Sequence, residues 1–163
     1  MRPPRQYPVD NSNAIDQNMN RPTPDTHDRY KHFLTIPTRW MDNDVYGHVN
    51  NVTYYSYFDT VVNQLLISRG VLDIEQSETI GLVVETHCNY FAPITFPDTL
   101  HAGLRVAALG ATSVRYEIGL FRENDATAAA QGHFVHVYVS RSTRKAAAVP
   151  DAVRALLAKL VVK

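Results

Sequence analysis

A short stretch of the chain, RWMDNDVYGHVNN at residues 39–51, holds side chains whose types and spacing could carry out chemistry. Two carboxylates, Asp42 and Asp44, are followed by a glycine, a histidine and two asparagines, directly before a helix-like sequence. A turn that leads into a helix needs only one turn residue and one capping residue. Most of these polar groups therefore exceed what folding requires, and we expect a functional site at this junction.

A carboxylate just ahead of a helix N-terminus suits acyl chemistry that needs no metal ion. The carboxylate could attack a carbonyl carbon or activate water, while free N–H groups of the first helical turn stabilise the resulting oxyanion. A calcium site is the alternative, because Asp42, Asp44 and Gly47 occupy the first, third and sixth places of an EF-hand loop. Tyr46 and Thr53 stand where further calcium ligands are needed, so we predict no metal.

The elements around this junction indicate an α+β fold. Residues 31–40 alternate in polarity as a first strand would, and residues 51–70 carry apolar side chains at helical spacing. Such a helix would have a single antiparallel sheet to lie on. Four further β-like segments follow at residues 79–91, 98–110, 112–124 and 127–141, and a short helix at residues 151–162.

Composition sets the limits on domain number and partners. Residues 1–28 are rich in Pro, Asn and Asp, and we expect a tail that is flexible or draped on a partner subunit. Residues 29–163 form one predicted domain. Sixteen basic and sixteen acidic side chains give no net charge, which argues against nucleic acid or an anionic membrane as partner. The lone Cys88 and the lack of a long apolar run lead us to expect a cytoplasmic protein.

The string D-x-D-x-x-G-H-V-N-N at residues 42–51, with tyrosines after it, resembles a known family. It is similar to the hotdog-fold thioesterases of the 4-hydroxybenzoyl-CoA thioesterase type, in their GHVNN variant. The resemblance implies a long central helix wrapped by a curved antiparallel sheet of about five strands. It also implies an acyl-CoA substrate, no cofactor, and a homodimer or homotetramer whose subunits pair edge to edge with sites between them.

The resemblance assigns catalytic roles residue by residue. The family's catalytic aspartate falls on Asp44, acting as nucleophile or general base, and the carbonyl-polarising backbone N–H falls on Asn51. Gly47 would allow close approach or a positive φ, and His48 would orient Asp44 or the substrate. Asp59, further along the helix, is the reserve catalytic candidate.

Other residues are assigned to the substrate. Coenzyme A carries three phosphates, and the basic residues after the last predicted strand could bind them. Near the junction, Tyr46, Asn50 and Tyr54 are expected to contact the substrate. No role is assigned to the histidines of the later strands. The substrate-binding candidates are Tyr46, Asn50, Tyr54, Arg141, Arg144 and Lys145.

Two other functions stay open at this stage. A hotdog dehydratase or hydratase would pair an aspartate with a histidine, but its usual Asn-Pro between them does not occur in DVYGH. A binding module that senses acyl-CoA without hydrolysing it is the second alternative. The sequence also leaves the acyl group unidentified.

Overall fold

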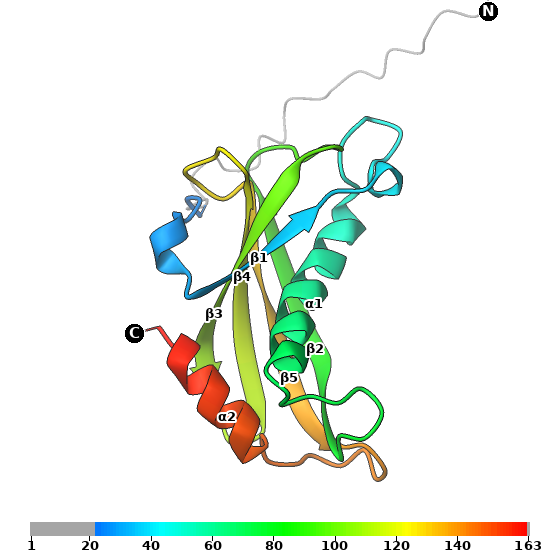
Figure 1. The fold of residues 1–163 in the computed structure, drawn as a ribbon, viewed down its shortest axis with the longest axis vertical. Helices are drawn as coiled ribbons and strands as arrows, with labels where there is room; N and C mark the ends of the chain where they lie inside the picture. Colours follow the sequence, from blue (N-terminus) through cyan, green and yellow to red (C-terminus); the bar gives the residue numbers. More distant parts are fainter. Residues whose placement is uncertain (1–21, 163) are drawn as a thin grey trace, which may run out of the picture.

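The computed structural model describes residues 22–162, in which an antiparallel sheet curves around one helix (Figure 1). The sheet has five strands in the order β1-β3-β4-β5-β2, with every pairing antiparallel. The α+β prediction is therefore confirmed. The strands are β1 His32–Pro37, β2 Thr79–Tyr90, β3 Thr99–Leu109, β4 Ser113–Arg122 and β5 Ala130–Ser140; the α-helices are α1 Asn51–Ser68 and α2 Asp151–Leu157; single 3-10 turns span His27–Arg29, Trp40–Asp42 and Ala158–Leu160.

Helix α1 lies on the concave face of the sheet (Figure 1). Its 18 residues extend for about 27 Å at 1.5 Å per residue. The predicted stripe is buried, with Phe58 and Val61 fully inaccessible to solvent. The helix ends two residues before Gly70, whose φ of +68° is the left-handed conformation that commonly terminates helices.

The concave face of the sheet supplies the rest of the core. Val114, Tyr116, Ile118 and Leu120 of β4 are all fully buried, as their alternation with polar residues predicts. On β5 the corresponding buried row is Phe134, His136 and Tyr138, so a histidine occupies a position in an apolar wall.

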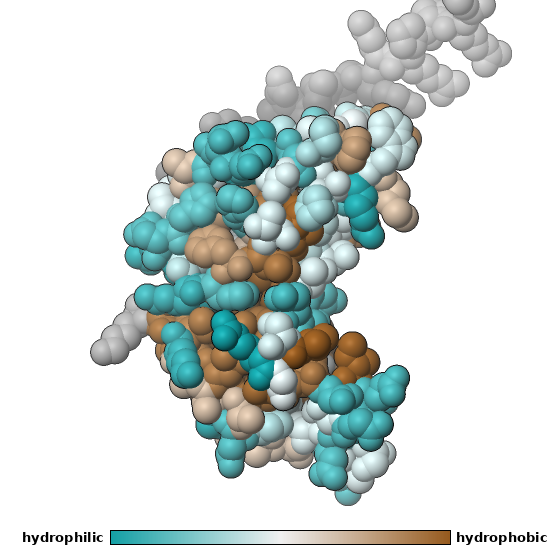
Figure 2. Space-filling view, in the orientation of Figure 1, coloured by the Kyte–Doolittle hydropathy of each residue, from teal (hydrophilic) through white to brown (hydrophobic). Residues whose placement is uncertain are grey.

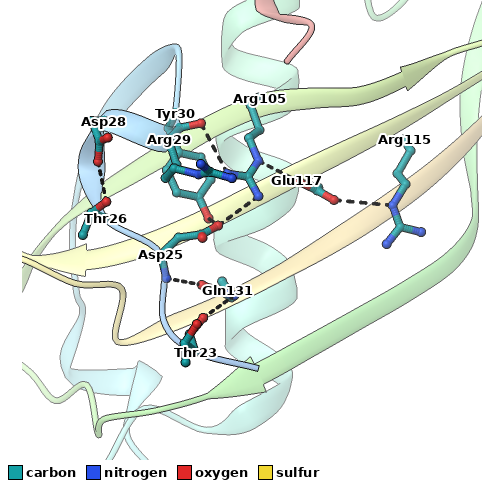
Figure 3. Close-up of polar contacts among 10 residues, drawn as sticks. All are labelled: Thr23, Asp25, Thr26, Asp28, Arg29, Tyr30, Arg105, Arg115, Glu117 and Gln131. Carbon is teal, nitrogen blue, oxygen red and sulfur yellow. Dashed lines mark hydrogen bonds and ion pairs between the residues drawn. The ribbon is translucent and has the colours of Figure 1, made fainter. Parts of the chain in front are cut away.

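The convex face of the sheet carries a cluster of ion pairs, which we call the outer-face cluster: Asp25, Arg105, Arg115 and Glu117 (Figure 3). Arg105 lies 2.9 Å from Asp25 and 2.7 Å from Glu117, and Arg115 lies 3.7 Å from Glu117. Because Asp25 precedes β1, this cluster ties the segment before the first strand to the middle of the sheet.

The ring of Tyr30 lies across the same face and explains two glycines. A Cβ at Gly103 would lie 2.8 Å from the Tyr30 ring, and one at Gly119 would lie 2.6 Å from it. Residues 1–21 of the predicted tail lie outside the described residues. Residues 22–28 are described and contact the sheet, for example where Asp25 N–H donates to Gln131 (2.7 Å).

Strand β2 forms one edge of the sheet and leaves apolar side chains in solvent. Leu82, Val83 and Val84 are 39%, 46% and 61% exposed. Figure 2 shows the apolar surface where β2 borders the lower half of α1. Within residues 22–162, no helix is long and apolar enough to cross a membrane.

Candidate active site

Asp42 is the buried member of the carboxylate pair, with 2% of its surface exposed. Its oxygens accept hydrogen bonds from the Arg39 backbone N–H (2.7 Å), the Arg39 guanidinium (2.8 Å) and the Tyr57 hydroxyl (2.7 Å). Burial alone would raise the pKa of Asp42, but these hydrogen bonds outweigh it and hold the pKa below its ordinary value. Asp42 therefore fixes the loop and α1 together, and its oxygens are already engaged.

Asp44 lies in a tight turn and is only partly buried. Its Oδ1 accepts from the Tyr46 N–H (2.8 Å), while its backbone N–H donates to the His48 carbonyl (2.8 Å) and its carbonyl accepts from the Gly47 N–H (3.1 Å). Among the described residues, no hydrogen bond reaches its second oxygen, Oδ2. The turn therefore fixes the direction of the carboxylate and leaves one oxygen available.

The turn that carries Asp44 depends on Gly47. The φ of Gly47 is +82°, which a residue with a side chain rarely adopts, so the predicted positive φ is confirmed. A Cβ there would meet nothing within 4 Å, so conformation rather than close contact requires this glycine. Its backbone carbonyl accepts from the Thr95 hydroxyl (2.8 Å), and the side-chain Oδ1 of Asn43 accepts from the Phe96 N–H (3.1 Å). These bonds attach the turn to the segment before β3.

Helix α1 begins immediately after this turn. Asn50 is its N-cap, because the side chain accepts from the Val52 N–H (3.2 Å) and the carbonyl accepts from the Thr53 N–H (2.9 Å). The N–H of Asn51 has no hydrogen-bond partner within residues 22–162. This donor therefore points out of a helix N-terminus, where the dipole favours negative charge.

The other predicted residues of the junction have different environments. Tyr46 is 82% exposed, and the His48 side chain is also exposed. Tyr54 instead is buried in the core, with its ring edge-on to Tyr90 at 4.9 Å, and burial raises the pKa of its hydroxyl to about 12. Asp59 lies two turns further along α1 on its exposed side, where partial removal from water raises the pKa of its carboxyl.

The basic residues assigned to phosphate binding lie at the opposite end of the fold from this junction (Figure 1). Arg141 follows β5, and its guanidinium donates to the carbonyls of Ser77 (2.7 Å) and Ile74 (2.8 Å). Arg144, with a φ of +59°, and Lys145 are exposed in the next turn. One chain therefore does not bring these residues to Asp44, because the length of α1 separates them.

Sequence reasoning gave no role to His136, which the structure places on the concave face of β5. His136 is 95% buried, and its Nε2 has no hydrogen-bond partner among residues 22–162. His133 differs, because it lies on the convex face between Arg115 and Glu85. The alternation of a strand predicts the opposite faces. The missing hydrogen bond could not be read from the sequence, because it depends on which side chains surround the ring.

The junction thus combines a fixed carboxylate with a backbone N–H at a helix N-terminus that no group of residues 22–162 engages. This pair of groups can attack or hydrate a carbonyl carbon and hold the oxygen that becomes negative. Within the part of the chain that the structure describes, no three His, Cys, Asp or Glu residues gather as metal ligands would.

Comparison with known proteins identifies the family to which this arrangement belongs. The sequence pattern of the Thioesterase-like superfamily matches residues 38–157. The chain belongs to the thioesterase-like superfamily. Its match begins one residue before the junction and continues through α2, so it includes all of the candidate catalytic residues.

Several solved structures share this fold. The PA5185 protein of Pseudomonas aeruginosa strain PAO1 is 53% identical over 85% of this chain and 97% of its own, with a TM-score of 0.83. The PA2801 protein of P. aeruginosa is 31% identical over 77% of this chain and 96% of its own, with a TM-score of 0.72. The BH1999 gentisyl-coenzyme A thioesterase is similar in fold, with a TM-score of 0.69 at 21% identity, over 77% of this chain and 99% of its own.

Proposed function

We propose that this protein is a hotdog-fold acyl-CoA thioesterase of the 4-hydroxybenzoyl-CoA thioesterase type. Asp44 is the nucleophile or general base, and the Asn51 N–H is the oxyanion donor. By the first route the carboxylate displaces the CoA thiolate and forms an anhydride that water then hydrolyses. By the second route it removes a proton from the water that attacks the thioester.

The observation that carries this proposal is the unequal engagement of the two carboxylates. Asp42 has its oxygens bound to Arg39 and Tyr57. Within the described residues 22–162, Asp44 is held by one oxygen only and lies close in sequence to the Asn51 N–H, which has no partner there. A group that is held in place but not neutralised suits catalysis. The CoA thioester as substrate is supported by the superfamily and by the activity that the BH1999 protein's name records.

The active form in this proposal is a homodimer joined along β2. An edge strand with exposed apolar side chains is open to pairing, and Leu82 to Val84 lie at the middle of β2. A two-fold axis there makes the pairing antiparallel, so that the beginning of each β2 lies beside the end of the other. Arg141, which is joined to the beginning of β2 through Ser77, then approaches the partner's junction and can meet the phosphates of CoA.

Steady-state hydrolysis of a panel of acyl-CoAs tests the function. Free CoA is measured with a thiol reagent, and aromatic, short, medium and long acyl groups are compared. Release of CoA supports the thioesterase. Binding of acyl-CoA without release of CoA would instead identify a binding module, and addition of water to an enoyl-CoA would identify a hydratase.

The dimer is tested by placing a charge on the exposed edge. Val84→Arg puts a cation at the middle of β2 and should yield monomers in light scattering, together with loss of thioesterase activity, because the substrate then meets only half of its site. Val161→Lys makes the same kind of change, from an apolar to a cationic side chain, beside β3 and not on β2. It is the control and should leave the dimer intact. An active Val84→Arg monomer would contradict the shared site.

A further inference from the structure

The turn at residues 44–48 has little side-chain packing to hold it in place. Val45 and Tyr46 are 94% and 82% exposed, and Gly47 and His48 are exposed as well. An exposed segment with few buried contacts lies at the low-stability end of a fold, so hydrogen bonds must fix it if it is to keep one conformation. The direction of the Asp44 carboxylate therefore depends on the hydrogen bonds that reach this turn.

These hydrogen bonds meet at the backbone carbonyl of Gly47. It accepts from the Thr95 hydroxyl at 2.8 Å and from the Asn43 side-chain amide at 3.3 Å. The same amide also donates to Thr95 Oγ1 at 3.3 Å. The hydroxyl has a single proton, and the Gly47 carbonyl is its nearest acceptor, because the Phe96 carbonyl lies at 3.3 Å. We call the side chains of Asn43 and Thr95 the Gly47 clamp.

The Gly47 clamp acts on Asp44 through the backbone of the turn. The Gly47 N–H donates to the Asp44 carbonyl at 3.1 Å, and the Tyr46 N–H donates to Asp44 Oδ1 at 2.8 Å. Both donors belong to the two residues at whose end the clamp holds the backbone. Rotation of this backbone would carry the donors away from Asp44, and the carboxylate would lose the bond that sets its direction.

The connection that supplies Thr95 also holds the approach to α1. Within this connection, which joins β2 to β3, the Thr95 N–H donates to Asp98 Oδ2 at 3.0 Å. The preceding residue, Ile94, is fully buried, and its carbonyl accepts from the Val49 N–H at 2.8 Å. Val49 stands two residues before Asn51. One connection thus fixes both the catalytic turn and the chain that leads to the oxyanion donor.

We propose that Thr95 and Asn43 are positioning residues, which set the Asp44 carboxylate at the distance and angle from the Asn51 N–H that the thioester requires. The proposal rests on the proposed thioesterase function. Neither side chain needs to touch the substrate, because both act through the carbonyl of Gly47. Displacement of a reacting group by about 1 Å can lower a rate by about 10². Loss of one bond of the clamp should therefore affect kcat more than stability.

Steady-state hydrolysis of the best acyl-CoA of the panel by Thr95→Val and Thr95→Ser tests the clamp. Valine has the shape of threonine without the hydroxyl, so kcat should fall by roughly tenfold or more, with KM changed by less than about twofold. Serine keeps the hydroxyl and should restore most of kcat. The melting temperature of Thr95→Val should fall by only about 2 °C, because the lost bond is exposed to solvent. Asn43→Ala removes the second donor and should also lower kcat.

Thr60→Val is the matched control. The Thr60 hydroxyl donates to the Ser56 carbonyl at 2.7 Å on the exposed side of α1, so the same chemical change removes a comparable bond away from the turn. This variant should keep the kcat of the wild type. A Thr95→Val variant with the kcat of the wild type, or a fall in kcat that Thr95→Ser does not restore, would overturn the positioning role.

Backbone order parameters from NMR separate this proposal from the proposed function. In Thr95→Val, the order parameters of the Tyr46 and Gly47 N–H groups should fall from about 0.85 toward about 0.6, while those of α1 stay unchanged. A turn as rigid in Thr95→Val as in the wild type would overturn the clamp. If the wild type hydrolyses no acyl-CoA, the proposed function fails, and the order parameters still decide whether Thr95 fixes the turn.

Discussion

The outer-face cluster and the junction at residues 39–51 both concentrate charged and polar side chains, but they differ in how completely those groups are paired. In the cluster, Arg105 meets two carboxylates and Glu117 meets two guanidinium groups. At the junction, Asp42 is equally engaged, whereas Asp44 retains an oxygen without a partner in the described part of the chain. A high density of polar side chains alone therefore does not identify a functional site. Groups that satisfy one another hold the fold, and groups that are fixed but unsatisfied can act on a substrate.

Asp42→Ala should have the largest effect on stability, because it removes a buried acceptor from the Tyr57 hydroxyl and the Arg39 backbone. The free energy of unfolding should fall by about 2 kcal/mol or more. Chemical denaturation measures the loss, and Glu123→Ala, in an exposed loop, is the control with little expected change. An Asp42→Ala variant as stable as the wild type would mean that these bonds do not hold the junction.

The lowered pKa of Asp42 also predicts a pH dependence. A carboxyl whose pKa is lower in the folded state stabilises the protein above its ordinary pKa, near 3.8, and loses that contribution as pH falls through the lowered value. The difference in unfolding free energy between wild type and Asp42→Asn should therefore shrink on acidification below about pH 4. A difference that stays constant down to pH 2 would contradict this origin.

Arg105→Met should have a smaller effect and none on catalysis. It leaves Asp25 and Glu117 without their shared cation and removes the guanidinium that lies 4.8 Å from the centre of the Tyr30 ring. We expect a loss of about 1 kcal/mol, or a few degrees in Tm, with kcat unchanged. Lys31→Met, an exposed cation nearby, is the matched control. A large fall in kcat for Arg105→Met would mean that the outer face takes part in the reaction.

Removing the segment before β1 should lower stability and leave catalysis unchanged. A chain that begins at residue 29 lacks Asp25, which pairs with Arg105 and whose backbone carbonyl accepts from the buried Ala128 N–H (2.9 Å). It also lacks His27, which stacks on the buried Phe121, whereas a chain that begins at residue 22 keeps all of these contacts. The first should melt a few degrees below the second, and both should retain kcat, because the lost contacts lie on the outer face and not at the junction. Scanning calorimetry of the two truncations measures the difference, and equal melting temperatures would show that residues 22–28 add nothing.

Much of the fold could be predicted because its signals are local. The alternation along β3 and β4 and the spacing of Tyr54, Phe58, Val61 and Leu65 are periodic, and each period corresponds to one buried face. The order of strands in the sheet carries no such local signal, and neither does the path of residues 22–31 across the outer face. That path depends on Gly103 and Gly119 making room for Tyr30, a contact between distant parts of the chain.

The candidate site was predictable in part for the same reason. Asp44, Gly47 and Asn51 lie in one local motif, so a single sequence window contains them. The placement of Arg141 far from Asp44 could not be anticipated from sequence, since it depends on α1 and β5 running in the same direction, which sets the end of β5 beside the segment that follows α1 and not beside the junction. His136 escaped notice because a histidine among apolar residues of a strand gives no indication of whether its nitrogens will find partners.

Single-turnover and steady-state hydrolysis by Asp44→Asn tests the central claim most directly. Asparagine keeps an oxygen that can accept from the Tyr46 N–H, so the turn and the melting temperature should be retained. With the best acyl-CoA of the panel, kcat should fall by roughly 10² or more, because nucleophile and base are both removed. Asp59→Asn, on the exposed side of α1, should keep most of its activity. Turnover near that of the wild type in Asp44→Asn, with loss of activity in Asp59→Asn, would contradict the account and assign catalysis to the helix.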